Sequence, residues 1–395
     1  MKTAMSFGTM VLSVCLLVPL TLAAATKQGD RVNATYWCAW GGNTSYSVEG
    51  KQIQSNPVDM DAVDSCYNVI IVAFIVTDDS GNYILALKNP GSQGSSYYTE
   101  QQVKDMIARA KEQGRKVIVS LGGQFFKVSM KTQDDVTTFS TQTRNIVDAY
   151  GFEGIDLDLE TDALSGIDPA LMAQAVMDVV SHYRDLGQDF WLTAAPEWCY
   201  IVPFMYGSGQ WASHTLAGSF YVDLVQAAGI ANFSYFWPQL YNQGPANGFA
   251  GPEEDDLGFP AKVIPTDGMD AFMSGFAWAA STTQGYEANG SMGVFIPAQK
   301  LALGIPATEG AAGGEMTYIA TPALIASGWS MMRQNNVAIA GFMNWSVDWD
   351  ALTITDGELS AGYAHAPWAT GLAVADVLKS AAGTPLPAVD ILLME

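Results

Sequence analysis

Short apolar runs rich in β-branched and aromatic residues recur along this chain, separated by stretches with helical periodicity. The alternation of strand and helix predicts parallel pairing, and eight such units can close into a single-domain (β/α)8 TIM barrel of the α/β class. An open, doubly wound sheet is the competing architecture. The predicted strands lie near residues 32–38, 68–76, 116–122, 153–160, 190–196, 235–242, 300–306 and 338–345.

Local signals mark where several of the intervening helices begin and end. Thr99 to Gln102 has the residue order of a capping box, and Asp168 before Pro169 is typical of an N-cap followed by proline at the first helical position. Glycines follow the predicted ends of both helices. Further helices are predicted within 131–150 and, with a weaker pattern, before Gly383.

One predicted strand carries an unusual row of acids. Residues 151–160 read GFEGIDLDLE, and strand geometry places Asp156, Asp158 and Glu160 on the same face. On an antiparallel sheet that face would be solvated, whereas in a barrel the helices cover the outer face and the acids point inward. Buried carboxylates are costly unless they share protons or serve chemistry. Glu160 lies nearest the C-terminal mouth, where burial and repulsion from Asp158 should raise its pKa and suit it to general-acid catalysis.

Four motifs, which follow one another along the chain in the order that the family has, resemble glycoside hydrolase family 18, the chitinase family. EGIDLDLE is similar to the family's strand-four pattern Asp-Gly-x-Asp-x-Asp-x-Glu, with Glu153 where the family usually has Asp. SLGG at 120–123 resembles its strand-three Ser-x-Gly-Gly, and QLYN at 239–242 resembles the strand-six Gln-x-Tyr-Asn of compact members. Trp345 ends the eighth predicted strand, where the family places a tryptophan that floors the subsite of the attacked sugar. The resemblance spans residues 32–382.

The resemblance implies retaining hydrolysis of β-1,4 bonds between N-acetylglucosamine units, in which the substrate's acetamido group replaces the enzyme nucleophile. Glu160 would protonate the glycosidic oxygen while the acetamido carbonyl attacks C1 and forms an oxazolinium ion. Asp158 would accept the amide N–H, and Asp156, hydrogen-bonded behind Asp158, would share a proton with it. The Tyr241 hydroxyl would hold the acetamide oxygen, and Gln239 would help to position the same sugar.

Aromatic faces and small residues are expected to complete the sugar site. The aromatic candidates are Trp345 as the floor and Trp198 and Phe74 as walls; the small residues expected to admit the ring are Gly122, Gly123 and Ala195; Asn242 completes the strand-six motif.

The spacing of the last strands bears on the shape of the groove. Only residues 307–337 separate the seventh and eighth predicted strands, too few for the insertion that walls the cleft of many processive chitinases. A shallow, open groove with internal cleavage is therefore expected, and the long 243–299 connection is the expected lid. An endo-β-N-acetylglucosaminidase acting on N-glycan cores is an alternative, as is a non-catalytic chitin-binding lectin. The presence of Glu160, Asp158 and Tyr241 argues against the lectin.

Charge and the N-terminus indicate an exported protein, and a monomer is expected. Residues 1–25 have the order of a secretory signal, so the catalytic domain is expected over 26–383 with a tail at 384–395. No later segment has 18 unbroken apolar residues. The formal net charge of −22 argues against nucleic acid and anionic membranes as partners. It favours solubility outside the cell over attraction to a cationic polymer.

Neither metal nor cofactor is expected. The three histidines, at 182, 214 and 365, lie far apart without ligand spacing. Cys38, Cys66 and Cys199 would remain after signal removal, an odd set in which one pair, with Cys38 and Cys66 nearest in sequence, could form a disulfide.

Overall fold

A computed structural model describes residues 25–42, 44–48, 51–89, 96–123, 128–160, 164, 166–202, 215–241, 268–288, 291, 293–312, 319–355 and 364–380. The expected tail, and the expected signal apart from Ala25, lie outside these ranges.

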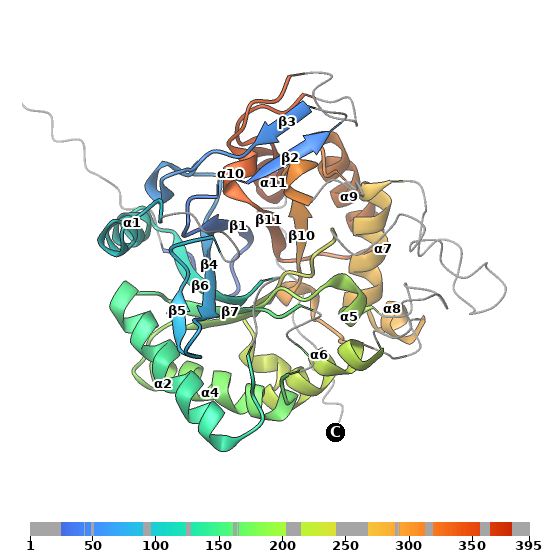
Figure 1. The fold of residues 1–395 in the computed structure, drawn as a ribbon. Coiled ribbons are helices and arrows are strands. Elements are labelled where there is room, and N and C mark those ends of the chain that lie inside the picture. The colour runs from blue at the N-terminus through green and yellow to red at the C-terminus, as the bar shows by residue number, and fades with distance from the viewer. Residues whose placement is uncertain are drawn as a thin grey trace, which may run out of the picture.

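Parallel strands form a ring at the centre of the molecule (Figure 1). They pair in the order β10-β11-β1-β4-β6-β7-β8-β9. Bridges from Phe236 to Leu301 and from Gln239 to Gly304 bring β9 back against β10, so the sheet returns on itself. The barrel prediction is thereby confirmed and the open sheet is excluded. The strands are β1 (Val32–Cys38), β4 (Val69–Thr77), β6 (Lys116–Gly122), β7 (Gly154–Asp158), β8 (Trp191–Ala194), β9 (Tyr235–Phe236), β10 (Ala302–Pro306) and β11 (Gly341–Trp345).

The predicted strands are correct in place, but β7, β8, β9, β10 and β11 are shorter than expected. β7 ends at Asp158, so Glu160 lies just beyond the strand. β9 covers only Tyr235–Phe236 because Pro238, which has no N–H to donate, interrupts the ladder. Pairing resumes through Leu240, whose N–H donates to the carbonyl of Gly304 at 2.9 Å.

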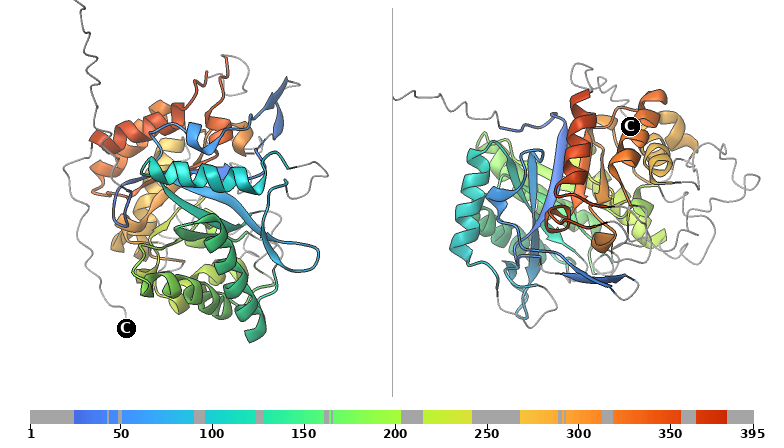
Figure 2. Two further views of the ribbon diagram at one scale, coloured as in Figure 1. Left: turned by 90° about the vertical axis from the view of Figure 1, so that its left-hand side faces the viewer. Right: turned by 90° about the horizontal axis from the view of Figure 1, so that it is seen from above.

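Helices surround the strands on the outside (Figures 1 and 2). The predicted signals are confirmed: the Thr99 side chain accepts from the N–H of Gln102, and Asp168 accepts from the N–H groups of Ala170 and Leu171. Burying the apolar stripes of the helices against the outer faces of the strands makes the main hydrophobic core. The helices are α1 (Glu100–Glu112), α2 (Gln133–Tyr150), α4 (Pro169–Asp185), α5 (Trp198–Ile201), α6 (Thr215–Ala228), α7 (Met269–Ser281), α8 (Thr283–Ala288), α9 (Pro322–Gln334), α10 (Val347–Asp350) and α11 (Ala369–Ser380).

The 243–299 connection is only partly what the sequence predicted. Its second half contains α7 and α8, and α7 packs against α9 as part of the helical layer. That half is therefore not a lid. Residues 242–267, which include the proline- and glycine-rich GPANGFAGPEEDDLGFP, lie outside the described residues.

Three short strands lie outside the barrel ladder of parallel strands. β2 (Ser45–Val48) and β3 (Lys51–Gln54) form an antiparallel hairpin after β1, and β5 (Tyr83–Leu85) pairs antiparallel with β4. Ile53 of β3 packs on a small apolar cluster around Trp349 of α10, which fastens the hairpin to the segment after β11. These strands carry too few alternating apolar residues to be predicted from the pattern.

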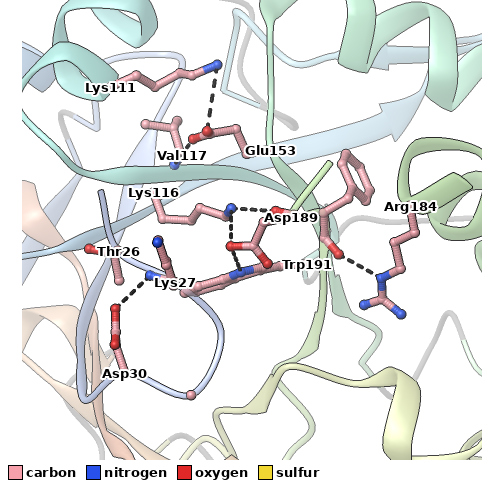
Figure 3. A network of polar contacts seen from close by, with 12 residues as sticks. Thr26, Lys27, Asp30, Lys111, Lys116, Val117, Glu153, Arg184, Asp189 and Trp191 are labelled. Carbon is pink, nitrogen blue, oxygen red and sulfur yellow. Dashed lines mark hydrogen bonds and ion pairs between the residues drawn. The ribbon is translucent and has the colours of Figure 1, made fainter. Parts of the chain in front are cut away.

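Polar contacts close the N-terminal end of the barrel. The ammonium group of Lys116 lies 5.0 Å from the centre of the Trp191 ring and donates to the carbonyl and carboxylate of Asp189 (Figure 3). The N–H of Gly29 donates to the Tyr235 hydroxyl, which donates to the carbonyl of Asp30. This end is therefore occupied by structural contacts, and the opposite end is left for the site.

Other expectations concern cysteines and membrane segments. Cys38, Cys66 and Cys199 are all free thiols, so the candidate pair is not bridged. Within the described ranges, none of the helices has the length and apolar character needed to cross a bilayer.

Candidate functional site

The acidic row faces the inside of the barrel, as predicted. Asp156 is 0% exposed and Asp158 is 3% exposed, whereas Ile155 and Leu157 pack outward in the main core. Gly154 precedes the acids on the inner face, where a Cβ would come within 2.7 Å of a methyl carbon of Ile118. The strand thus places its two aspartates towards the C-terminal mouth.

Asp156 accepts four side-chain hydrogen bonds. Its Oδ2 accepts from the hydroxyls of Tyr36 at 2.6 Å and Ser120 at 2.7 Å. Its Oδ1 accepts from the Thr193 hydroxyl at 2.5 Å and from the Trp237 indole N–H at 2.9 Å. Burial raises the pKa of Asp156, and each of these hydrogen bonds lowers it. Sequence reasoning missed Tyr36, Thr193 and Trp237 because each is also an ordinary inward-facing strand residue.

A hydrogen bond between Asp156 and Asp158 was expected from the sequence. In the structure the two carboxyl groups interact through their charges, and Asp158 accepts its hydrogen bond from another residue. Its Oδ1 accepts from Nε2 of Gln239 at 2.6 Å, and the same Nε2 donates to the carbonyl of Ala195 at 3.1 Å. Burial, and then repulsion from Glu160 and Asp156, raise the pKa of Asp158 well above its usual range. Gln239 is therefore the side chain that holds Asp158 in place.

Glu160 lies just past the end of β7 and is partly exposed. Burial, followed by the charge of Glu197, raises the pKa of Glu160 to about 7, while a hydrogen bond with Gln239 lowers it. The raised pKa agrees with the prediction. Asp158 and Glu160 repel each other as expected, and Glu197 adds a further like charge that the sequence analysis did not predict. A carboxyl group that is half protonated near neutrality can act as a general acid.

Glu197 was missed in the sequence. It follows β8 in the segment APEW and pairs as an isolated bridge with Gln239. Its position beyond the C-terminal end of a predicted barrel strand was the available signal.

Two tyrosines lie at the acidic row: Tyr241 near the acids themselves, and Tyr221 of α6 against the backbone that carries them. Burial and the charges of Asp158, Glu160 and Asp156 raise the pKa of the Tyr241 phenol well above its usual range. The Tyr221 hydroxyl donates to the carbonyl of Leu159 at 3.1 Å and accepts from its N–H at 3.2 Å, fixing the backbone immediately before Glu160. Nothing in the helical pattern of α6 distinguishes Tyr221 from a core residue. Asn242 lies outside the described residues.

Aromatic rings gather at the mouth. Phe74 and Trp345 stack with ring centres 6.0 Å apart and an interplanar angle of 17°. Tyr36 lies edge-on to Trp345 at 5.2 Å, which links this group to Asp156. Trp345 is partly exposed, as a sugar floor requires, and Trp40 extends the group through its contact with Phe74.

Several of the expected sugar-contacting residues are buried, among them Phe74, which is 6% exposed. Trp198 is 1% exposed and packs edge to face on Phe272 of α7, with ring centres 5.7 Å apart. Ala195 is fully buried. A stacking wall needs an accessible ring face, so the burial of Trp198 does not favour that role.

Two glycines at the end of β6, Gly122 and Gly123, allow close backbone approach. Gly122 has φ +128, and a Cβ there would lie 1.9 Å from the carbonyl oxygen of Asp158. Gly123 has φ +78, its N–H donates to the same oxygen at 2.8 Å, and a Cβ would lie 2.6 Å from the Phe74 ring. These contacts give both positions a conformational requirement beyond the expected room for a sugar.

The arrangement suits acid-assisted cleavage of an uncharged substrate. One carboxyl with a pKa of about 7 lies beside two buried aspartates and a tyrosine, under a group of aromatic rings. Across the described part of the chain, no three His, Cys, Asp or Glu side chains are placed to hold a metal ion.

Comparison with known proteins gives a consistent family. Residues 33–351 match the family described as "Glycosyl hydrolases family 18". A chitinase of Enterococcus faecalis is 29% identical over 325 residues, which cover 82% of each chain. Endochitinase 37 of Trichoderma harzianum is 27% identical over 349 residues, covering 84% of this chain and 89% of that protein. The chain spans 58% of the length of another relative, Chitinase Chi52 of Paenibacillus xylanexedens. The match has 28% identity over 338 residues and covers 78% of this chain.

A solved structure has a similar fold. The crystal structure of a family GH18 chitinase from Chromobacterium violaceum superposes with a TM-score of 0.59 at 21% identity, covering 90% of this chain and 85% of that one.

Proposed function

Because the chain belongs to glycosyl hydrolases family 18, we propose that it is a chitinase that hydrolyses β-1,4 bonds between N-acetylglucosamine units. The observation that carries this proposal is the pKa of about 7 at Glu160, beside the Asp158 carboxyl that Gln239 holds. The names of the relatives, a chitinase and an endochitinase, support the same substrate.

The reaction begins when Glu160 donates its proton to the glycosidic oxygen. The acetamido carbonyl of the bound sugar attacks C1, the C1–O bond breaks, and an oxazolinium ion forms. The anionic Glu160 then accepts a proton from water, whose oxygen attacks C1 from the face that the leaving group occupied. The C1–O bond of the oxazolinium ring breaks, and the acetamide is restored. The product therefore keeps its β configuration.

Asp158 is placed to accept the acetamide N–H and to balance the positive charge that develops on the ring. This requires Asp158 to exchange its hydrogen bond from Gln239 for one from the substrate, or to accept both. Tyr241, close to all three acids, is proposed to donate to the acetamide oxygen and to align it for attack. The Trp345 ring is the proposed floor beneath this sugar.

We propose that cleavage is internal. The segment between β10 and β11 is short, and its described residues contain α9 packed in the helical layer and add no further domain to wall the groove. The relative from Trichoderma harzianum is an endochitinase by name. Secretion through residues 1–25 and a monomeric state remain parts of the same proposal.

Product analysis on N-acetylglucosamine tetramers to hexamers tests the function. The wild-type protein should release β-anomeric products, and Glu160→Gln should lower kcat by roughly two or more orders of magnitude. Glu153→Gln is the matched control, because Glu153 lies at the opposite end of the same strand region, towards Val117 and Lys111 (Figure 3). Its kcat should equal that of the wild type.

Two outcomes would contradict the proposal. Oligomers left intact by the wild-type protein would rule out chitinase activity, and cleavage of a high-mannose glycopeptide under the same conditions would assign the glycan core as substrate. Full activity of Glu160→Gln would rule out Glu160 as the acid.

A further inference from the structure

The carboxylate of Asp156 is saturated by neutral donors that converge from four separate parts of the barrel. Tyr36 comes from β1, Ser120 from β6, Thr193 from β8 and Trp237 from the segment after β9. Each oxygen receives two hydrogen bonds, and all five residues are at most 1% exposed. Side chains of the barrel therefore fix the position of this group.

The four donors are not equivalent. The hydroxyl groups of Tyr36, Ser120 and Thr193 can turn to accept a hydrogen bond, but an indole N–H can only donate. If Oδ1 of Asp156 carried a proton, the buried N–H of Trp237 would lose its acceptor at 2.9 Å. A buried donor without a partner is unfavourable, so Trp237 favours an unprotonated Oδ1.

A proton on Oδ2 of Asp156 is disfavoured because of the donors that this oxygen already has. Oδ2 already accepts from two hydroxyls, and a proton there would require Tyr36 or Ser120 to reverse its role. The ionised form alone satisfies all four donors at once.

We propose that Trp237 is a positioning residue for hydrolysis, whose indole N–H holds Asp156 as a stationary anion so that the mobile proton of the acidic row stays with Asp158 and Glu160. Thr193 supports the same oxygen of Asp156. The fixed negative charge then lies behind Asp158, where it balances the oxazolinium ion. The inference rests on the proposed function, because it assigns a part in that reaction.

Other titratable groups face Asp156 and are common to all variants. The Tyr36 phenol lies on β1, Asp158 on the same strand, the Tyr221 phenol on α6 and the Tyr241 phenol after β9. Glu160 and Glu197 act on Asp158 in turn. These groups stay the same in every variant. A change in the pH profile that follows the loss of the Trp237 N–H can therefore be assigned to Asp156.

The test is the pH profile of kcat for Trp237→Phe on an N-acetylglucosamine pentamer. Losing a hydrogen bond to a charged group should lower kcat by about tenfold or more near neutrality. The ratio of the variant's kcat to that of the wild type should fall further as the pH is lowered, because Asp156 then takes up a proton more readily. A merely structural defect would lower kcat by the same factor at every pH.

A matched tryptophan controls for the loss of ring volume. Trp191 and Trp237 flank Tyr235 in the barrel interior, with ring centres 5.0 Å and 5.4 Å from it. The N–H of Trp191 donates at 3.2 Å to Asp189, away from the acidic row (Figure 3). Trp191→Phe should leave the shape of the profile unchanged.

Thr193 supplies a second route if Trp237→Phe does not fold. Thr193→Val removes the donor to Oδ1 at nearly constant volume and should change the profile in the same direction. Thr193→Ser keeps the hydroxyl and should restore the wild-type shape.

The outcomes separate this inference from the proposed function. If Glu160→Gln is inactive while the kcat ratios of Trp237→Phe and Thr193→Val are constant with pH, Glu160 keeps its role and the anchoring role of Trp237 is overturned. The anchoring role is also overturned if Trp191→Phe changes the profile as much as Trp237→Phe does. If the wild-type protein leaves the pentamer intact, the proposed function itself fails. If Glu160→Gln is fully active, Glu160 is not the acid, and the role of Trp237 in keeping the proton on Asp158 and Glu160 fails with it.

Discussion

Gln239, which follows β9, contacts two neighbouring acids of the row: its Nε2 lies 2.6 Å from Oδ1 of Asp158, and its side chain also hydrogen bonds Glu160. The bond orients the carboxyl that must meet the acetamide and lies beside the carboxyl that must protonate the leaving group. Gln239 reaches both because the bridge to Gly304 fixes its backbone after β9.

Replacing Gln239 by leucine should lower kcat by roughly ten- to a hundredfold, since a hydrogen bond to a charged group contributes about 1.5–3 kcal/mol. Steady-state kinetics on N-acetylglucosamine oligomers measures this. Gln334→Leu, at the end of α9 and exposed, is the control and should behave as the wild type. An unchanged kcat in Gln239→Leu would show that Asp158 is oriented without it.

The pH dependence on the basic side should follow Glu160. Its pKa is raised to about 7, and the acid is active when protonated, so kcat should be retained below about pH 7 and lost as the pH rises through it. Glu197→Gln removes a negative charge that raises this pKa, so the basic limb should move to lower pH. Glu197→Asp keeps the charge and should leave the limb close to its wild-type position. A basic limb that stays in place in Glu197→Gln would exclude Glu197 as a cause.

Gly122 should be irreplaceable for a steric reason. Both Gly122 and Gly187 have positive φ, but a Cβ at Gly122 would lie 1.9 Å from the carbonyl of Asp158, whereas a Cβ at Gly187 would meet nothing within 4 Å. Gly187→Ala should cost about 1–2 kcal/mol of unfolding free energy, from backbone strain alone. Gly122→Ala should cost more than about 3 kcal/mol, or fail to fold, because backbone must move. Urea unfolding of the two variants measures the difference, and equal costs would show that β7 can shift without penalty.

The sequence predicts the elements of this fold better than it predicts the roles of individual site residues. Strand positions follow from local apolar runs, and the inward direction of Asp156 and Asp158 follows from the period of two along β7. Glu197 and Trp237 were missed because their importance comes from pairing between strands that are remote in the chain. The burial of Trp198 could not be predicted for the same reason: its neighbour Phe272 belongs to a helix that lies more than seventy residues later. A pattern along one strand carries no information about which ring another element covers.

Asp350 should be a main determinant of stability outside the site. Its Oδ2 accepts from the Tyr67 hydroxyl at 2.5 Å and from the N–H of Gly371 at 3.1 Å, and its Oδ1 accepts from the N–H of Thr370 at 3.0 Å. His365 Nε2 lies 3.3 Å from the same Oδ1. The carboxylate thus ties α10 to Tyr67 and to the start of α11.

Asp350→Asn should lower the free energy of unfolding by roughly 3 kcal/mol, because an amide NH2 in this buried position would face N–H and O–H donors without an acceptor between them. Asp376→Asn, exposed on α11, is the matched control and should change stability by less than about 0.5 kcal/mol. Urea unfolding compares the two variants. Equal stability of Asp350→Asn and the wild type would mean that Tyr67 and His365 reorient to satisfy the amide, and the carboxylate would then not be the group that holds α11 to the barrel.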